Sequence, residues 1–397
     1  MFIRALQDTL ISYAKFPVVA LLGPRQSGKT TLVKETFKKH TYTSFEDPET
    51  RSLAQNDPHK FLHIYENKQG IIIDEFQYVP EILSYIQLEV DEKKRPGYFI
   101  LTGSQNFLMN QAITQSLAGR VGILTLLTLS LAELNKNHLM ESERAAHIII
   151  NGGYPRIYAE SFSPQELYSS YIQSYIERDV RNLSHVGDLR SFQRFMQLCA
   201  GRIGQQLNLS ELATVCGISV PTAQRWISIL EASYIIFLLQ PHFNNFNKRL
   251  TKSPKLYFYD TGIACSLLNI ETPEVFELHP LRGNIFEGFI ISDLVKQFFN
   301  QGRRPSLYFW RDLNGRLEVD CLIDEGLKLV PIEIKAGETF SSSYFDGLAS
   351  WNELTNTTPK DNYVIYGGEH TQARSAGNLV AWRDAGVLID KIKTKYS

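Results

Sequence analysis

The chain has 397 residues, 43% of them hydrophobic and 21% charged, a composition typical of globular proteins that excludes a mainly disordered chain. Its 41 basic and 42 acidic residues give a net charge of −1, so the whole chain carries no charge signal for nucleic acid or an anionic membrane. Four scattered cysteines indicate neither disulfides nor structural zinc, and the longest uncharged apolar stretch, 121–132, is too short to span a bilayer. We therefore expect a cytoplasmic protein of two to four domains with no membrane partner.

The first informative motif is a glycine-framed loop. A helix is expected at the start of the chain, and the apolar run Val18–Leu22 then predicts a buried strand that enters the loop. Gly23 and Gly28 bracket four residues, and Lys29 follows directly. This spacing lets backbone N–H groups surround a β-phosphate while the lysine reaches the β- and γ-oxygens. The pattern also arises by chance in loops, but the helix predicted at 31–39 argues against chance. The expected ATP contacts are Gly23, Gln26, Ser27, Gly28, Lys29, Thr30 and Thr31.

Two carboxylates follow a second apolar run. After a helical pattern at 51–66, the run that begins at Gly70 predicts a strand ending in Asp74 and Glu75. At the carboxyl edge of a parallel sheet, Asp74 would hold Mg²⁺ together with the Thr30 hydroxyl, usually through water. Glu75 would orient or deprotonate the water that attacks the γ-phosphate. Two acids after a strand also have a purely structural interpretation.

Two further positions could act on the phosphates. The strand predicted at 98–102 leads to Ser104, whose hydroxyl could sense the γ-phosphate or position water, although an ordinary Ser/Thr turn is the alternative. Arg120 lies between a predicted helix and a predicted strand. There it could neutralise transition-state charge in its own subunit or across a subunit boundary of a homo-oligomer. A lone arginine in a loop is as readily a solvated surface residue.

These segments resemble those of a known family. The chain is similar over almost its whole length to the prokaryotic AAA-type ATPases that carry a C-terminal domain of unknown function. The resemblance implies a P-loop domain with a Walker A loop, a Walker B strand, a sensor strand and a characteristic arginine, in keeping with ATP and Mg²⁺ as cofactors. The stretch Glu177-Arg178-Asp179 is a hallmark of the family, but the sequence does not indicate its role. The matching segments are 23–30, 70–75, 101–104, 117–120, 152–155 and 175–180.

The middle of the chain differs in charge from the rest. Ten basic and four acidic residues at 178–255 give this region a net charge of +6, so the remainder carries −7. Such a block suggests a module that faces a polyanion such as duplex DNA, although a solvated basic surface gives the same count. Just before it, an apolar stripe at 168–176 predicts linker helices whose tyrosines and isoleucines face a core rather than a ligand.

Residues 209–231 have the punctuation of a helix–turn–helix. We expect Ser210 to cap the first helix and Gly217 to make the turn. A second helix, which begins at 219–221 and carries Arg225, would be the one that contacts DNA.

A hairpin-like segment comes next and would form a wing. Strands predicted at 234–239 and 254–259 flank a turn that contains Lys248, Arg249 and Lys252. Winged helices contact DNA but also dock proteins, so duplex DNA and a protein partner both stay open.

The last hundred or so residues predict a separate α/β unit. An amphipathic helix at 284–299 carries Glu287. Three strands follow, of which the second carries Asp320 and the third carries Glu333 and Lys335. Side-chain alternation puts Glu333 and Lys335 on one face of the third strand, beside Asp320 if the two strands pair.

These four positions indicate hydrolytic phosphodiester chemistry. Asp320 and Glu333 could bind Mg²⁺, and Lys335 could orient a water or offset phosphate charge. The arrangement resembles the PD-(D/E)xK restriction-endonuclease-like fold, in which Glu287 would support the metal. The alternatives are a polar strand edge held by an ion pair, or a nuclease fold without turnover.

The sequence therefore predicts an α/β protein of four parts. They are a P-loop NTPase domain with a parallel sheet at 1–150, a helical linker at 151–200, a winged helix-turn-helix at 201–265 and a restriction-endonuclease-like α/β domain at 280–397. The expected function is Mg²⁺-dependent ATP binding and hydrolysis coupled to a C-terminal region that binds nucleic acid, with DNA cleavage left open. The alternative is a regulatory ATPase switch whose C-terminal domains dock protein partners. Whether DNA stimulates ATP hydrolysis discriminates between the two.

Overall fold

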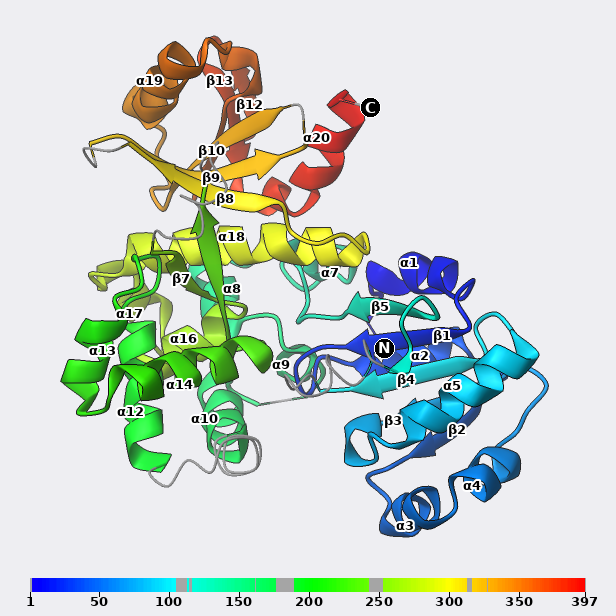
Figure 1. Cartoon of the computed structure of the whole chain (residues 1–397). Helices are drawn as coiled ribbons and strands as arrows, with labels where there is room; N and C mark the ends of the chain where they lie inside the picture. Colours follow the sequence, from blue (N-terminus) through cyan, green and yellow to red (C-terminus); the bar gives the residue numbers. More distant parts are fainter. Residues whose placement is uncertain are drawn as a thin grey trace. The chain divides into compact units, whose positions relative to one another are not determined.

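The computed structural model describes residues 2–104, 113, 116–160, 162–175, 189–242, 253–312, 316–326 and 328–396. The chain divides into two compact units (Figure 1). The first comprises Met1–Leu129 with two short later segments, Ala232–Tyr234 and Phe299–Arg303. The second comprises Ser130–Glu231, Ile235–Phe298 and Arg304–Ser397. No helix in the described ranges is both long and apolar enough to cross a membrane.

The first unit is built on a parallel sheet. Its described residues form five strands in the order β2-β3-β4-β1-β5, and every neighbouring pair is parallel. Because helices cover both faces, the strands read as continuous apolar runs rather than as alternating ones. The strands are β1 (Val18–Leu22), β2 (Thr41–Ser44), β3 (Ile71–Asp74), β4 (Phe99–Gly103) and β5 (Val121–Thr125).

Alternate residues of β1 face two separate cores. Val18 and Ala20 pack with apolar residues of α3, α4 and α5, whereas Val19 and Leu21 pack with those of α1 and α2. The helices among the described residues of this unit are α1 (Leu6–Tyr13), α2 (Lys29–Thr36), α3 (Pro48–Asn56), α4 (Pro58–Ile64) and α5 (Ile82–Lys93), with a short 3-10 turn, η1, at Phe76–Tyr78.

The helical pattern predicted at 51–66 is two helices rather than one. Asp57 ends α3 and accepts a hydrogen bond from the Lys60 N–H at 3.0 Å, so it also caps α4. Pro58, which has no N–H to donate, then occupies the first position of α4. The Asp-Pro pair therefore breaks a periodicity that looks continuous in the sequence.

The second unit begins with a group of helices. They are α7 (Leu131–Lys136), α8 (Ala145–Asn151), α9 (Pro155–Ala159), α10 (Pro164–Tyr175), α12 (Leu189–Ala200), α13 (Leu209–Cys216), α14 (Val220–Ala232), α16 (Thr261–Leu267) and α17 (Pro273–Leu278). The apolar stripe predicted in the linker is core, since its described members, Tyr168, Tyr171, Ile172 and Tyr175, are all buried on α10.

Asp260 explains the Gly-Gly-Tyr-Pro stretch at 152–155. Its buried carboxylate caps α16 and accepts hydrogen bonds from the Gly153 N–H at 2.8 Å and the Tyr168 hydroxyl at 3.0 Å. Gly152 has a φ of +63°, and a Cβ there would collide with both Asp260 and Tyr168. Gly152 therefore allows close packing around a buried carboxylate, and Gly153 supplies one of its hydrogen bonds.

Helices α13 and α14 lie in the segment where the helix–turn–helix was predicted. Gly217 makes the turn with a φ of +73°, as expected. The cap of α13 is Asn208 and not Ser210, because the Asn208 side chain accepts from the Glu211 N–H at 3.1 Å. The helix thus begins earlier than predicted.

The predicted wing strands belong to a larger sheet. Strands β6 (Ile236–Pro241) and β7 (Lys255–Phe258) pair antiparallel as expected, but β6 also pairs in parallel with β8 (Leu307–Arg311). The described strands of this sheet number eight, in the order β12-β13-β11-β10-β9-β8-β6-β7. The others are β9 (Glu318–Asp324), β10 (Leu329–Lys335), β11 (Tyr363–Tyr366), β12 (Gln372–Arg374) and β13 (Gly377–Ala381).

The described part of this unit also contains three helices, labelled α18, α19 and α20 in Figure 1, and three short 3-10 turns. The apolar side of α19 packs with β9, β11 and β13 residues in one core. The elements are α18 (Arg282–Asn300), α19 (Asp346–Thr355), α20 (Leu388–Tyr396), η3 (Ser342–Phe345), η4 (Pro359–Asp361) and η5 (Trp382–Val387).

Candidate nucleotide site and carboxylate cluster

The glycine-framed loop joins β1 to α2 at the carboxyl edge of the first sheet. Gly23 has a φ of +149° and Gly28 a φ of +92°, and a Cβ at Gly23 would collide with the Leu126 carbonyl. Both positions therefore require glycine for the sharp turn into the helix. Lys29, predicted to follow the loop, is the first residue of α2.

Lys29 is folded back over its own loop. Its ammonium donates to the carbonyl oxygens of Gly23 at 3.0 Å and Pro24 at 2.7 Å, and the residue is buried. A buried ammonium next to a turn of this kind supplies positive charge where phosphate oxygens are expected.

A residue that the sequence did not indicate also holds this loop. The buried guanidinium of Arg4 donates to the Ser27 carbonyl at 2.6 Å and to the Leu127 carbonyl at 2.7 Å. It ties the loop to the segment after β5. No local pattern predicts this contact, because Arg4 is far from both partners in the sequence.

The structure brings Thr30 and Asp74 together. The Thr30 hydroxyl donates to Asp74 Oδ2 at 2.9 Å, and Asp74, at the end of β3, is only 5% exposed. The Thr102 hydroxyl donates to the other carboxylate oxygen. The end of the loop and the ends of two strands thus meet at one carboxylate, as the motif spacing predicts.

Tyr42 on β2 is a further member of this group. Its hydroxyl also donates to Asp74 Oδ2, at 2.9 Å. Burial, and next the charge of Asp74, raise the pKa of Tyr42 far above its usual range, so its hydroxyl stays protonated and remains a donor. Sequence reasoning missed Tyr42 because its role depends on β2 lying next to β3.

Glu75 and Ser104 meet through a third side chain. The Gln77 amide donates to the Glu75 carboxylate and, at 3.2 Å, to the Ser104 hydroxyl. Glu75 itself has a left-handed backbone, with a φ of +53°. Gln77 therefore fixes the orientation of Glu75, the predicted water-activating carboxylate, a role that the sequence did not suggest.

Arg120 lies away from its own nucleotide site. It immediately precedes β5, whereas the phosphate loop follows β1, and these two strands are parallel. Arg120 and the loop therefore lie at opposite edges of the sheet. Its guanidinium binds Asp91 through two hydrogen bonds of 2.6 and 2.9 Å. A role at the nucleotide site of the same subunit does not fit this position. A role across a subunit boundary and an ordinary surface ion pair with Asp91 both stay open.

In the second unit, the four predicted cluster residues come from α18 and two paired strands. Strands β9 and β10 are antiparallel with Cys321 opposite Ile332, which places Asp320 beside Glu333. Asp320 accepts from the Ile334 N–H at 2.8 Å, and Lys335 forms an ion pair with Glu333. The strand pairing on which the prediction depended is therefore present.

A second lysine, which the sequence did not indicate, lies in this cluster. Lys255 on β7 is 5% exposed, and its ammonium lies 3.0 Å from Glu287 and 2.5 Å from Glu318. The Tyr257 hydroxyl donates to the same Glu287 oxygen. We define the carboxylate cluster as Lys255, Tyr257, Glu287, Glu318, Asp320, Glu333 and Lys335.

Burial weakens the acidity of the cluster. It raises the pKa of Glu287 to about 7 and that of Glu333 to about 8, and the charge of Asp320 adds to both. Burial also raises the pKa of Asp320. Burial lowers the pKa of Lys255, but the neighbouring carboxylates outweigh it and raise the value overall, so this lysine stays charged.

The cluster fits a divalent cation only in part. Glu333 Oε2 is buried and has no hydrogen-bond partner, as a ligand awaiting a cation would be. Within the described ranges, however, no three His, Cys, Asp or Glu residues are arranged to hold a metal. Asp320 and Glu333 supply two carboxylates, a number that suffices for Mg²⁺ only with water and phosphate oxygens.

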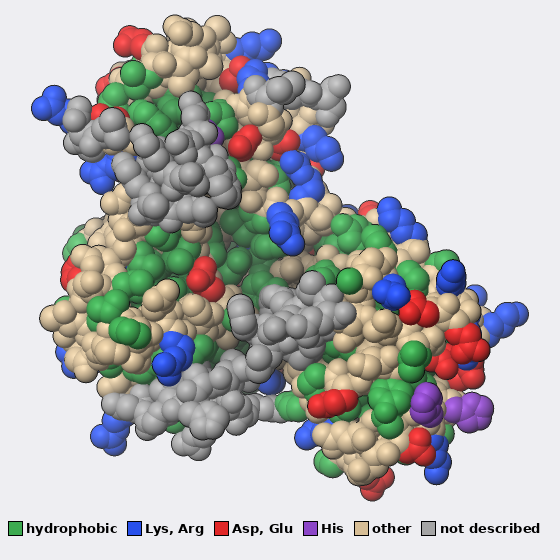
Figure 2. All heavy atoms as spheres, in the orientation of Figure 1, with side chains coloured by type: hydrophobic (Ala, Val, Ile, Leu, Met, Phe, Trp, Pro, Cys, Tyr) green, Lys and Arg blue, Asp and Glu red, His purple; other side chains and the backbone are tan. Residues whose placement is uncertain are grey.

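Part of the basic region at 178–255 is buried or ion-paired rather than available to a polyanion. Lys255 is buried in the cluster, and Arg202 forms an ion pair with Glu211. On the face in Figure 2, the described Lys and Arg side chains are interspersed with Asp and Glu side chains. Arg190, Arg194 and Arg225 are exposed. Glu177, Arg178, Asp179, Arg181, Lys248, Arg249 and Lys252 lie outside the described residues.

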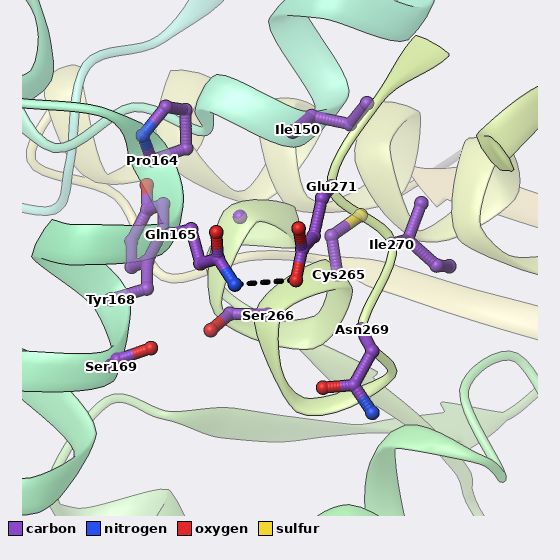
Figure 3. Close-up of a pocket in the computed structure, with 11 residues that line it drawn as sticks. Ile150, Pro164, Gln165, Tyr168, Ser169, Cys265, Ser266, Asn269, Ile270 and Glu271 are labelled. Carbon is purple, nitrogen blue, oxygen red and sulfur yellow. Dashed lines mark hydrogen bonds between the residues drawn. The ribbon is translucent and has the colours of Figure 1, made fainter. Parts of the chain in front are cut away.

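A small cavity lies between α10 and α16. Figure 3 shows Gln165 reaching from α10 to hydrogen-bond Glu271, with Tyr168 and Cys265 also in the lining. Its volume of about 40 Å³ has room for a few water molecules but not for a nucleotide. A neighbouring hollow of about 450 Å³ is lined mainly by amide and hydroxyl side chains.

Comparison with protein families identifies the first part of the chain. Residues 15–135 match the family model described as the AAA domain, and this range includes the loop, Asp74 and Ser104. They form a P-loop domain of the AAA type. Two further matches, at 142–274 and 282–384, are to families each described as a domain of unknown function.

Relatives that match most of this chain occur in mycobacteria. The chain is 29% identical over 356 residues to uncharacterized protein Rv2008c of Mycobacterium tuberculosis and to uncharacterized protein Mb2031c of Mycobacterium bovis. Each alignment covers 89% of this chain and 77% of the relative.

Solved structures are more distant. The Walker-type ATPase PABY2304 of Pyrococcus abyssi is 15% identical, with a TM-score of 0.44 over 68% of this chain and 96% of that one. The RuvB Holliday junction branch migration motor of Thermotoga maritima is 18% identical, with a TM-score of 0.28 over 58% of this chain and 86% of that one. These scores are low, so the family match and the site geometry identify the domain.

Proposed function

We propose that the chain hydrolyses ATP with Mg²⁺ at the carboxyl edge of the five-stranded sheet. The observation that carries the proposal is the 2.9 Å hydrogen bond from Thr30 to Asp74, which joins the end of the phosphate loop to the end of β3. These two side chains are the ones expected to hold Mg²⁺ in a P-loop enzyme. The AAA match over 15–135 supports the assignment.

Each part of the site has a separate task. Lys29 offsets charge on the β- and γ-phosphates, and the loop N–H groups from Gln26 to Thr31 bind the phosphate oxygens. Bound Mg²⁺, held by Thr30 and Asp74, would neutralise further phosphate charge. Glu75 takes a proton from the attacking water or orients it.

Ser104 and Gln77 orient the Glu75 carboxylate. Gln77 contacts both Glu75 and Ser104, so a change at Ser104 is felt at Glu75 through a single side chain. Ser104 is therefore suited to report the γ-phosphate to the water-activating carboxylate. Arg120 would act only on the nucleotide of an adjacent subunit in a homo-oligomer.

In this proposal, the C-terminal part binds the nucleic acid on which the ATPase acts. We assign DNA contact to α14, where Arg225 is exposed, and a divalent cation with phosphodiester hydrolysis to Asp320 and Glu333. Glu287 would support the cation, and Lys335 would act at the attacking water. The unpartnered Glu333 Oε2 supports this assignment.

One observation favours a second function. Lys255 already neutralises part of the carboxylate cluster, as expected for a structural ion-pair network. In that case the C-terminal domains would dock a protein partner, and the nucleotide state would act as a switch.

Phosphate release tests the proposal. The full chain is incubated with ATP and Mg²⁺, with and without duplex DNA. We expect hydrolysis that requires Mg²⁺ and rises in the presence of DNA. Hydrolysis that does not respond to DNA favours the docking function, and absence of both ATP binding and hydrolysis contradicts the nucleotide site itself.

A further inference from the structure

Lys255 reaches the carboxylate cluster from outside the segment that carries the acids. It lies on β7, next to β6 and far in sequence from β9 and β10, which bear Asp320 and Glu333. Even so, its ammonium contacts both Glu287 and Glu318. The cluster therefore has an internal cation that its own sequence motif does not include.

The Lys255 ammonium lies among the carboxylates that would attract a divalent cation. It shares one Glu287 oxygen with the Tyr257 hydroxyl, and Asp320 is close enough to raise its pKa. A divalent cation next to Asp320 and Glu287 would therefore meet a buried like charge. Like charges in a poorly solvated site repel strongly, so the two cations compete.

The lysine does not satisfy the whole cluster. Glu333 is 8% exposed, and its Oε2 atom has no hydrogen-bond partner although Lys335 contacts the other oxygen. A buried carboxylate oxygen without a partner is costly, and either a proton or a bound cation relieves that cost. The cluster is thus neutralised on the Glu287 side and incomplete on the Glu333 side.

We propose that Lys255 occupies the cation position of the carboxylate cluster and thereby sets its affinity for a divalent cation. With the ammonium in place, Mg²⁺ or Mn²⁺ binds weakly. When the charge at position 255 is removed, Glu287 becomes available beside Asp320 and Glu333, and the cluster binds the divalent cation tightly. This inference rests on the metal-binding role proposed for the cluster, and it names the residue that regulates that role.

A purely structural ion pair predicts something different. If Lys255 only stabilises the fold, its replacement destabilises the protein and creates no metal affinity. If it competes with a cation, its replacement also strengthens divalent-cation binding. Cation binding therefore distinguishes the two roles, whereas stability alone does not.

The experiment measures Mn²⁺ binding to the full chain without nucleotide. Free Mn²⁺ is followed by electron paramagnetic resonance, because bound Mn²⁺ loses its sharp signal. All proteins carry Asp74→Asn, which removes the metal ligand of the nucleotide site. We compare this parent with Lys255→Met, which removes the charge and keeps the length, and with Lys255→Arg, which keeps the charge.

We expect Lys255→Met to bind one Mn²⁺ per chain at least about tenfold more tightly than the parent, because a buried like charge is removed. Lys255→Arg should behave as the parent does. Adding Asp320→Asn to Lys255→Met should abolish the gained site. A gain that survives Asp320→Asn, or equal Mn²⁺ affinity in the parent and Lys255→Met, overturns the proposal.

A second variant protects the test against misfolding. Lys255→Gln is neutral but retains N–H donors for Glu287, so it should fold where Lys255→Met does not, and it should show the same gain. Mn²⁺ should also raise the Tm of either neutral variant by more than it raises the Tm of the parent. If Mn²⁺ raises all three Tm values equally, the proposal is contradicted.

The readout separates this inference from the proposed functions. It uses no nucleotide, so failure of ATP hydrolysis leaves it intact. Equal and measurable Mn²⁺ binding in the parent and in Lys255→Met, abolished in the latter by Asp320→Asn, overturns the role of Lys255 alone. Absence of Mn²⁺ binding in all of them overturns that role together with the metal-binding role of the cluster.

Discussion

The two carboxylate-centred sites of this molecule are satisfied by different kinds of donor. In the nucleotide site, Asp74 accepts hydrogen bonds from the hydroxyls of Thr30, Tyr42 and Thr102. In the carboxylate cluster, Glu287 and Glu333 are paired with the ammonium groups of two lysines. A hydroxyl orients a carboxylate and leaves its charge in place, whereas an ammonium orients the carboxylate and also neutralises its charge.

The difference bears on what each site is prepared to bind. The charge of Asp74 stays available to a cation, and the donors around it hold the carboxylate in place beforehand. The cluster carries part of its counter-charge within the chain, so a cation must either displace a lysine or use the remaining free oxygen of Glu333. Similar residue types therefore give an open site in one unit and a partly filled one in the other.

The largest expected effect is in the open site. Glu75→Gln should retain ATP binding and lower hydrolysis by about 10²- to 10⁴-fold, because it removes a general base. Lys29→Ala should weaken ATP binding by roughly 10- to 100-fold, as expected for a lost charge-assisted hydrogen bond. A fluorescent ATP analogue measures binding, and phosphate release measures turnover.

Glu81→Gln is the matched control for this pair. Glu81 is an exposed carboxylate of the same unit, so its replacement should change neither quantity. Equal ATP affinity in the wild type and Lys29→Ala would overturn the loop assignment.

The next-largest expected effect concerns DNA cleavage by the carboxylate cluster. Plasmid nicking in Mg²⁺ or Mn²⁺, with ATP present and absent, should fall by at least about 10²-fold in Asp320→Ala and in Lys335→Ala. Asp324→Ala, at the end of the same strand as Asp320, is the control and should nick normally. Nicking that persists in both cluster variants indicates contamination. No nicking under any condition leaves this domain as a binding module.

The contrast between the sites also shows what sequence can predict. The phosphate loop, Asp74 and Glu75 are predictable because each depends on local order: a strand, a tight turn and acids at a strand end. The pairing of Asp320 with Glu333 is predictable because consecutive strands usually lie side by side. These contacts need little knowledge of the overall topology.

The missed residues depend on long-range pairing. Tyr42 contacts Asp74 only because β2 lies beside β3, and Lys255 enters the cluster only because β6 pairs with β8. Arg4 reaches the loop from the chain start. A basic residue in a positively charged segment is usually predicted to be exposed. The sequence therefore assigns Lys255 to the block predicted to face DNA, although the residue is buried.

A smaller effect tests whether the second unit contacts DNA at all. Arg225→Gln should weaken duplex binding and flatten the dependence of log affinity on log salt by about one unit. Arg202→Gln is the control, because Arg202 is already paired with Glu211 and should change the slope less. Binding that ignores salt, or absent binding at low salt, favours protein docking.

The smallest expected effects come from two tyrosines that occupy equivalent roles. Tyr42 donates to Asp74, and Tyr257 donates to Glu287, so each Phe substitution removes one neutral donor from one carboxylate. A hydrogen bond of this kind contributes about 1 kcal/mol, or roughly fivefold in an equilibrium. Tyr42→Phe should therefore raise the Mg²⁺ concentration needed for half-maximal ATP hydrolysis by a few fold, since Asp74 keeps its charge but loses orientation.

Tyr257→Phe should act mainly on stability. Glu287 keeps its lysine, so the loss should be about 1 kcal/mol in the free energy of unfolding, measured by urea denaturation, with a smaller effect on hydrolysis than Tyr42→Phe. The comparison depends on this division, because a donor that only orients a carboxylate matters most where that carboxylate must bind a cation. If both variants lowered hydrolysis equally, or if Tyr42→Phe changed only stability, the hydroxyl donors of Asp74 would have no special part in preparing the nucleotide site.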